Sequence, residues 1–304
     1  MTAPRLNSTQ SLPATPETDE RGFGVGSSSG QIRTASLMGA RFADVSESDA
    51  VGLVVDAAVA GRGYWTITAN LDHLRRYTQD PQARELMDSA DMVVADGTPL
   101  IWASRLAGVP LSERIAGSNM IWSICEAASR RDASVFLLGG DLGVAQRAAR
   151  VLVARYPALR IVGTSCPPLG FERDENEMNR IERHLLESAP QIVFVGLGFP
   201  KQDLLIRRLR RSLPNASFTG VGISFSFIAG DVTRAPAWTH TLGLEWAHRL
   251  LKEPRRLLRR YVVQGMPFAL RLFTAGAWHR VTGGEGRWGW NGVPPDSPES
   301  GEQL

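Results

Sequence analysis

Short apolar runs alternate with amphipathic stretches along the middle of the chain. The apolar runs have the length and composition of buried strands: Tyr64–Thr68, Met92–Ala95, Ser134–Leu138, Arg160–Gly163, Ile192–Gly196 and Ser217–Val221. The stretches between them repeat apolar residues at helical spacing: about Ala83–Ala90, Asn119–Arg131, Leu142–Arg155, Glu175–Glu187 and Gln202–Leu213. This order predicts an α/β fold with a mostly parallel, Rossmann-like sheet and helices on both of its faces.

The two ends of the chain lack this periodicity. Residues 1–40 are rich in Ser, Thr, Pro and Gly, so we expect a disordered N-terminal arm. Residues 283–304 contain several prolines and are expected to form a disordered tail. The arm has no apolar core of the kind found in signal peptides, which favours a cytoplasmic protein. The α/β domain is therefore assigned to residues 41–236.

A basic segment follows the predicted sheet domain. Residues 237–282 are expected to be helical, with one helix from Gly243 to Lys252 and a second from about Arg255 to Ala277, kinked near Pro267. The chain has a net charge of only +3, yet six basic residues stand against one acid between residues 249 and 260. We expect residues 249–278 to dock on an anionic membrane surface, and we expect no nucleic-acid binding. The alternative is a solvated basic face packed on the core.

Polar side chains follow the first predicted strand at its carboxyl end, where parallel sheets bind their ligands. They are Thr68, Asn70, Asp72 and His73, and they either hold a sugar or phosphate or cap the next helix. Asp96 follows the second strand, where it is either a general base or an N-cap.

Glycines and one arginine stand near the ends of other elements. Arg114 and Gly117 precede a helix whose amino end could receive an anion. The turns at Gly139-Gly140 and at Gly196-x-Gly198 come directly after strands, and their backbone amides could approach a diphosphate. Neither turn completes the P-loop or the dinucleotide-binding pattern. The sequence therefore favours a nucleotide pocket of another kind.

The chain carries no pattern for a resident metal or cofactor. Its two cysteines lie far apart and its five histidines have no ligand spacing. No pair of aspartates separated by one residue is present to hold a divalent cation. We therefore expect neither a metal site nor a cofactor.

Taken in order, these motifs resemble the WecG/TagA/CpsF family, glycosyltransferase family 26, over roughly residues 45–275. The resemblance rests on the residues already named and on three later groups: Pro200-Lys201-Gln202, Gly230 with Arg234-Ala235-Pro236, and the run from Gly243-Leu244-Glu245-Trp246 to Glu253-Pro254-x-Arg256. Two positions depart from the family pattern. Asp203 stands where Glu is common, and Ser226 stands where an acid is common.

The resemblance implies an enzyme of bacterial exopolysaccharide or cell-wall polymer synthesis. It would be an inverting, metal-independent glycosyltransferase that moves a sugar from a UDP-sugar to a polyprenyl-diphosphate-linked acceptor, as a peripheral protein on the inner face of the cell membrane. The donor sugar and the oligomeric state stay open.

The resemblance also implies roles for individual residues. Asp96 would be the general base, with Thr68 and Asn70 in the same pocket and Arg256 or Arg259 of the appendage at the leaving diphosphate. The remaining substrate contacts would come from Asp72, His73, Arg114, Gly117, Gly139, Gly140, Gly198, Pro200, Lys201, Gln202 and Arg234.

Two other functions fit part of the pattern. A sugar-nucleotide-modifying enzyme such as an epimerase would share the donor pocket but has no need of the basic appendage. A noncatalytic membrane-bound nucleotide-sugar sensor would keep the glycine turns but has no need of Asp96.

Overall fold

A computed structural model describes residues 32–232, 258–283 and 287–291. The expected helix from Gly243 to Lys252 lies outside these residues, as do most of the expected arm and tail.

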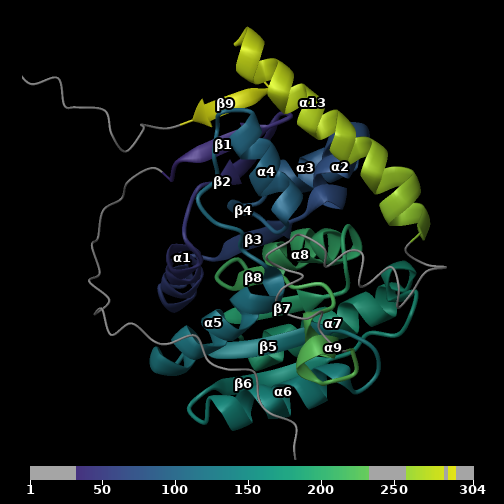
Figure 1. Ribbon diagram of the computed structural model, residues 1–304. Coiled ribbons are helices and arrows are strands. Elements are labelled where there is room, and N and C mark those ends of the chain that lie inside the picture. Colours follow the sequence, from purple (N-terminus) through teal and green to yellow (C-terminus); the bar gives the residue numbers. More distant parts are fainter. Residues whose placement is uncertain (1–31, 233–257, 284–286, 292–304) are drawn as a thin grey trace, which may run out of the picture. The chain divides into compact units, whose positions relative to one another are not determined.

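The described residues contain a six-stranded parallel sheet. Its strands are β3 (Tyr64–Ala69), β4 (Met92–Ala95), β5 (Ser134–Gly139), β6 (Arg160–Ser165), β7 (Ile192–Gly196) and β8 (Ser217–Gly220). They lie in the order β4-β3-β8-β7-β5-β6 (Figure 1). Every strand expected from the apolar runs is present, so the predicted sheet is confirmed.

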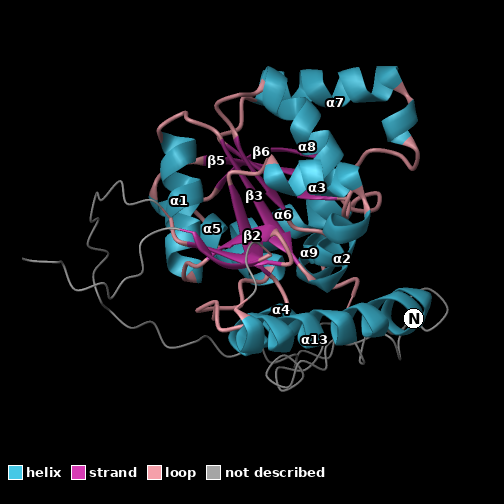
Figure 2. Ribbon diagram, turned by 90° about the horizontal axis from the view of Figure 1, so that it is seen from above, coloured by secondary structure: helices cyan, strands magenta, loops and turns pink. Residues whose placement is uncertain are grey.

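Helices cover both faces of this sheet, as predicted. One face carries α2 (Leu71–Gln79), α3 (Pro81–Asp88), η1 (Phe171–Arg173), α7 (Glu175–Ser188) and α8 (Lys201–Ser212). The other carries α1 (Glu47–Val59), α5 (Gly117–Arg130), α6 (Val144–Arg155) and α9 (Ser224–Ile228). Figure 2 shows α1 and α5 on one side of the strands and α3, α7 and α8 on the other. Alternate strand residues supply the two cores: in β7, Val193 and Val195 belong to the first core and Phe194 belongs to the second.

A second, antiparallel sheet corrects the predicted domain boundaries. Strands β1 (Thr34–Leu37) and β2 (Ala40–Ala43) form a hairpin, and β9 (Trp288–Asn291) pairs with β1. The boundaries at residues 40 and 283 were therefore wrong, since both the expected arm and the expected tail contribute strands. Their apolar runs are only four residues long, and burial of Leu37, Phe42 and Trp288 against the larger domain fixes them.

The described C-terminal segment consists of η2 (Arg259–Gly265), a π-helix, and α13 (Met266–Thr282). Where a kink was expected near Pro267, the helix type changes: the π-helix η2 ends at Gly265, and α13 begins at Met266 with the proline in its first turn. α13 packs against α4 (Thr98–Leu106), and η2 lies against α2 (Figure 2). Within the described residues, each helix is too short or too polar to cross a bilayer.

Candidate active site

Asp96 and Arg114 meet at the carboxyl end of β4. The amide of Asp96 donates to the Ala69 carbonyl at 2.8 Å, and the amide of Ile115 donates to the Ala95 carbonyl at 2.9 Å. These bonds bring the two segments together, and Asp96 Oδ1 lies 3.7 Å from Arg114 Nη1. The side chains are 30% and 25% exposed, so the pair is open to solvent at the sheet edge.

The N-cap alternative for Asp96 is not what the structure shows. Gly97 is the N-cap residue of α4, and its φ of 146° is a conformation that only glycine adopts readily. Asp96 therefore precedes the cap, and its carboxyl group lies beside Arg114 at the start of the turn.

Thr68 joins three segments at the end of β3. Its hydroxyl donates to the Gly220 carbonyl at 3.2 Å. A Cβ placed on Gly117 would lie 2.7 Å from the Thr68 hydroxyl oxygen. The side chain is buried. Gly117 therefore allows α5 to begin close against β3 and β8. Thr68 thus lies where the sequence predicted the site, and its side chain packs between these segments.

Asn70 caps α2. Its side-chain oxygen accepts from the amides of Asp72 at 3.0 Å and His73 at 3.4 Å, so the capping interpretation of this residue is confirmed. Asn70 also lies beside the turn after β4, because its Cβ is 4.0 Å from the position of a Cβ on Gly97. It thus lies next to Asp96 in the fold.

The other polar residues of this helix bind within the protein. Asp72 pairs with Arg75 at 2.8 Å and with Arg76 at 3.2 Å on the outer turn of α2. The buried His73 ring lies 4.4 Å from the ring of Phe199, which belongs to the loop after β7. His73 therefore couples the loop after β3 to the loop after β7, a contact that the sequence alone did not indicate.

The two glycine turns come together, but not as an open cradle of amides. Gly139 and Gly196 are paired across β5 and β7, and the Gly140 amide donates to the Gly196 carbonyl at 2.9 Å. The Gly198 amide donates to Gln202 Oε1 at 3.1 Å. Both amides are thus engaged inside the protein, which differs from the expectation that they face a ligand. Close packing explains Gly196, where a Cβ would lie 2.8 Å from the Phe225 ring, whereas Gly198 has a positive φ of 75°.

Gln202 connects two loops at the same edge. Its side chain is buried, and its Oε1 accepts from the amide of Gly198 and, at 3.2 Å, from that of Gly222. Its Nε2 occupies the space into which a Cβ on Gly220 would project. Sequence reasoning missed Gly220. The available signal was its position at the end of a predicted strand, beside another glycine-bearing loop.

Asp203 is a fully buried acid next to Gln202. Among the described residues no hydrogen bond reaches either of its carboxyl oxygens, and Trp65 Nε1 is likewise unsatisfied. Burial raises the pKa of Asp203 to about 7, although the nearby donors of Gln202 and Trp65 favour the carboxylate. Asp203, which stands where Glu is common in the family, therefore lies in the core and not in the exposed part of the sheet edge.

The remaining predicted residues lie on α8 and η2 or outside the described chain. Pro200 is the N-cap residue of α8, and the Nζ of Lys201 pairs with Glu172 of η1 at 2.9 Å. Arg259 begins η2. Arg234 and Arg256 lie outside the described residues.

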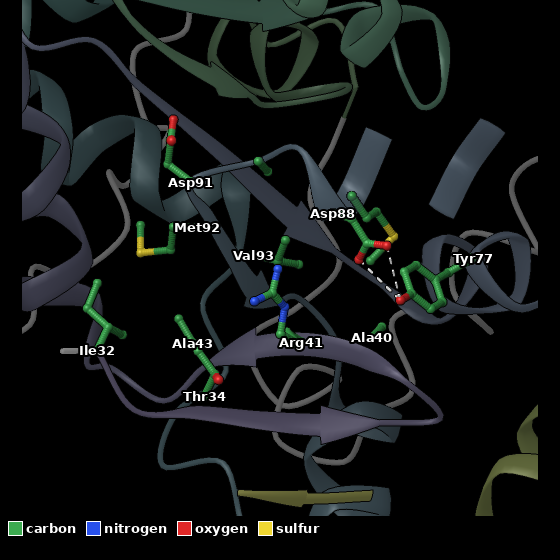
Figure 3. Close-up of a pocket in the computed structure, with 12 residues that line it drawn as sticks. Ile32, Thr34, Ala40, Arg41, Ala43, Tyr77, Asp88, Asp91, Met92 and Val93 are labelled. Carbon is green, nitrogen blue, oxygen red and sulfur yellow. Dashed lines mark hydrogen bonds between the residues drawn. The ribbon is translucent and has the colours of Figure 1, made fainter. Parts of the chain in front are cut away.

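A separate cavity lies near the amino end of β4. It has a volume of about 130 Å³ and is lined by residues of β2, α3, β4 and the turn before β4, among them Arg41, Asp88 and Asp91 (Figure 3). Tyr77 donates across its wall to Asp88 at 3.1 Å. None of the site residues predicted from the sequence lines this cavity. In the part of the chain that is described, no group of three or more His, Cys, Asp and Glu residues is placed to hold a metal ion.

Comparisons with known proteins indicate the family of the chain. A family model described as "Glycosyl transferase WecG/TagA/CpsF family" matches residues 35–282. A protein of Bacillus spizizenii is 32% identical over 198 residues, which are 65% of this chain and 75% of that protein. A protein of Bacillus subtilis is 31% identical over 175 residues, or 58% of this chain and 66% of its own length. Both relatives are named N-acetylglucosaminyldiphosphoundecaprenol N-acetyl-beta-D-mannosaminyltransferase.

Proposed function

Because the chain belongs to the WecG/TagA/CpsF family and is a glycosyltransferase, we propose that it moves N-acetylmannosamine from its UDP-linked donor to N-acetylglucosaminyl-diphosphoundecaprenol. The acceptor and the transferred sugar are taken from the names of the two relatives. The product would be an intermediate of a bacterial cell-wall polymer or exopolysaccharide.

The position of Asp96 is the observation that carries this proposal. Its carboxyl group is partly exposed at the carboxyl edge of a parallel sheet, beside the guanidinium of Arg114. Because Gly97 is the N-cap residue of α4, the Asp96 carboxyl group does not serve as the cap of this helix. A carboxylate held in this way is suited to accept a proton from a hydroxyl group.

The proposed reaction is a single displacement. Asp96 removes the proton from the acceptor hydroxyl as the hydroxyl oxygen attacks the anomeric carbon of the donor. The bond from that carbon to the diphosphate oxygen breaks, and the diphosphate leaves with the bonding electrons. One displacement inverts the anomeric centre, and one carboxylate suffices because no glycosyl-enzyme intermediate is formed.

Negative charge develops on the departing diphosphate and must be met by the protein. We assign this task to arginines, because preorganised charges at the point where charge develops usually give the largest catalytic contribution. Arg234, Arg256 and Arg259 are the candidates from the C-terminal segment. The mechanism requires no metal ion, so activity is expected to persist in EDTA. Loss of activity in EDTA with recovery in Mg²⁺ or Mn²⁺ contradicts this part of the proposal.

Transfer assays test the reaction itself. Purified protein is incubated with a short-chain lipid-diphosphate acceptor carrying N-acetylglucosamine and with a panel of UDP-sugars, and the products are separated by mass. We expect product from UDP-N-acetylmannosamine and an inverted anomeric configuration by NMR. If only another UDP-sugar gives product, that sugar is the donor in place of UDP-N-acetylmannosamine. An interconverted UDP-sugar without acceptor consumption identifies the epimerase alternative.

We further propose that the protein works as a peripheral protein at the inner face of the membrane. Apolar residues on the outer side of the C-terminal helices support this, because they stand opposite the buried residues of α13. They recur at helical spacing and are largely exposed: Val263, Met266, Leu270, Trp278 and Val281. Such a surface fits the headgroup boundary of a bilayer, and adjacent basic residues add about 1 kcal/mol each on anionic lipid.

Vesicle flotation tests this surface. The double variant Leu270→Ser/Trp278→Ser should lose most of its binding to anionic vesicles at low salt, because both side chains are exposed on α13. Leu186→Ser is the matched control, since Leu186 is 51% exposed on α7, away from the C-terminal segment. Equal flotation of the wild type and the double variant discards the membrane role of α13.

A further inference from the structure

The strand β9 lies beyond the part of the chain that matches the family. That match ends at residue 282, which is the last residue of α13, whereas β9 runs from Trp288 to Asn291. The family resemblance therefore does not account for this strand. Its contacts reach both the N-terminal hairpin and α13.

On one side, β9 is bonded to the hairpin. It pairs antiparallel with β1, with Trp288 opposite Leu37 and Trp290 opposite Ala35. The Arg287 carbonyl also accepts from the Gly39 amide at 2.8 Å and from the Ser36 hydroxyl at 3.3 Å. The guanidinium of Arg33 lies 3.3 Å from the centre of the Trp290 ring.

On the other side, β9 packs against α13. Trp288 is only 8% exposed, and its ring stacks on His279 at a centroid distance of 6.3 Å. A Cβ on Gly276 would lie 3.4 Å from the Trp288 ring and 3.3 Å from the Ala103 carbonyl of α4. Gly276 therefore allows α13 to touch α4 and Trp288 at one point.

Apart from Trp288, the domain holds α13 mainly through the first part of the helix, where Phe273 and Ala275 are also partly buried against the core. Its buried residues are Phe268, Leu272 and Gly276, all within its first eleven positions. Beyond Gly276 the helix meets the domain through His279 on Trp288 and through Arg280, whose guanidinium fills the space beside Gly108. Most of the stability of a helix in a protein comes from the tertiary packing of one face, so these contacts determine whether this end of α13 stays in place.

We propose that residues 287–291 act as a clasp that fixes α13, and Trp288 is the positioning residue at its centre. The helices beneath α13 and η2 are α4 and α2, and each begins directly after a site loop, at Gly97 and at Asn70 respectively. By fixing α13 against α4, the clasp steadies the helix that begins directly after Asp96 and Gly97; this last step rests on the proposed function.

The test compares chains that end at residue 283 and at residue 292. The first lacks the clasp and the second retains it. Hydrogen exchange of full-length and truncated proteins is followed by mass spectrometry in peptides of α13, β3 and β7. We expect removal of the clasp to speed exchange in α13 at least about tenfold, with β3 and β7 unchanged, because α13 opens locally without unfolding of the sheet.

A point variant separates the role of Trp288 from that of the deleted residues. Trp288→Ala should reproduce the faster exchange of α13, whereas Trp122→Ala, which removes a partly buried indole of α5 on the other core, should not. In transfer assays, loss of the clasp should raise the apparent KM for the lipid acceptor more than it lowers kcat.

The outcomes are distinct. Unchanged exchange in α13 after both changes overturns the clasp, whatever the enzyme does. Faster exchange with unaltered kinetics overturns the positioning role. If no chain, including the full-length protein, shows transfer, the proposed function fails while the exchange data still decide whether β9 holds α13.

Discussion

The two halves of the sheet edge are built differently. At the end of β4, the charged groups of Asp96 and Arg114 are partly exposed. At the ends of β5, β7 and β8, the corresponding positions are glycines packed around the buried side chains of Gln202 and Phe225. The first half offers side chains for chemistry, and the second offers a closely packed backbone.

This difference separates two kinds of effect. A substitution in the exposed half should change the reaction and leave folding intact, since little packing is lost there. A substitution in the packed half should disturb the loops first and the reaction through them. Each of the following predictions tests one side of this contrast.

The largest effect is expected for Asp96→Asn. Without a base to take the acceptor proton, kcat should fall at least about a hundredfold, while thermal stability and UDP binding stay close to those of the wild type. Steady-state transfer kinetics, calorimetric melting and UDP titration measure these three quantities. Asp56→Asn is the control, because Asp56 pairs with Arg131 on the surface of α1 and should leave kcat unchanged. A near-normal kcat in Asp96→Asn removes this residue from the mechanism.

Gly220→Ala should act mainly on stability. The new Cβ would collide with the Gln202 amide and lie 3.0 Å from its Cδ, so the side chain that bonds two loops must move. We expect a loss of about 1–3 kcal/mol in unfolding free energy and a raised KM for the UDP-sugar. Denaturant titration and donor saturation curves measure both changes.

Gly52→Ala provides the matched control for the glycine in β8. Gly52 lies in α1, and no atom is close to the position of its added Cβ. The same chemical change should therefore stabilise the protein by about 0.5–1 kcal/mol. If Gly220→Ala and Gly52→Ala change the unfolding free energy alike, close packing at Gly220 does not contribute to stability.

The effect of Asp203→Asn depends on pH. Burial raises the pKa of Asp203 from 3.8 to about 7, so the folded protein holds a proton that the unfolded chain has already released between these values. The wild type therefore loses stability as pH rises from about 4 to about 7, and the Asn variant lacks this contribution. Urea unfolding at pH 5 and pH 8 should favour the variant more at pH 8. An equal difference at both values shows that Asp203 is not held neutral.

The sequence predicted the parallel sheet well because its strands are continuous apolar runs, such as Ile192–Gly196, that stand out directly along the chain. It placed Asp96 at the carboxyl edge of the sheet because this residue directly follows a predicted strand, whereas it placed Arg114 only before the amino end of a helix. It did not predict α2, where polar and charged side chains outnumber apolar ones and the N-cap Asn70 was an equal candidate for the site. Nor did it predict β9, because four residues among prolines and glycines carry no periodicity of their own.

The sequence by itself determined the strands, the order of the motifs and the family, because each of these is encoded locally along the chain. Only the tertiary structure decided what each polar residue contacts. Gln202 bonds the loops after β7 and β8 because those strands are neighbours in the sheet, although the bonded amides of Gly198 and Gly222 are far apart in sequence. Likewise Trp288 reaches Gly276 and β1 only after the chain has folded back, since pairing over this separation depends on the packing of the whole domain.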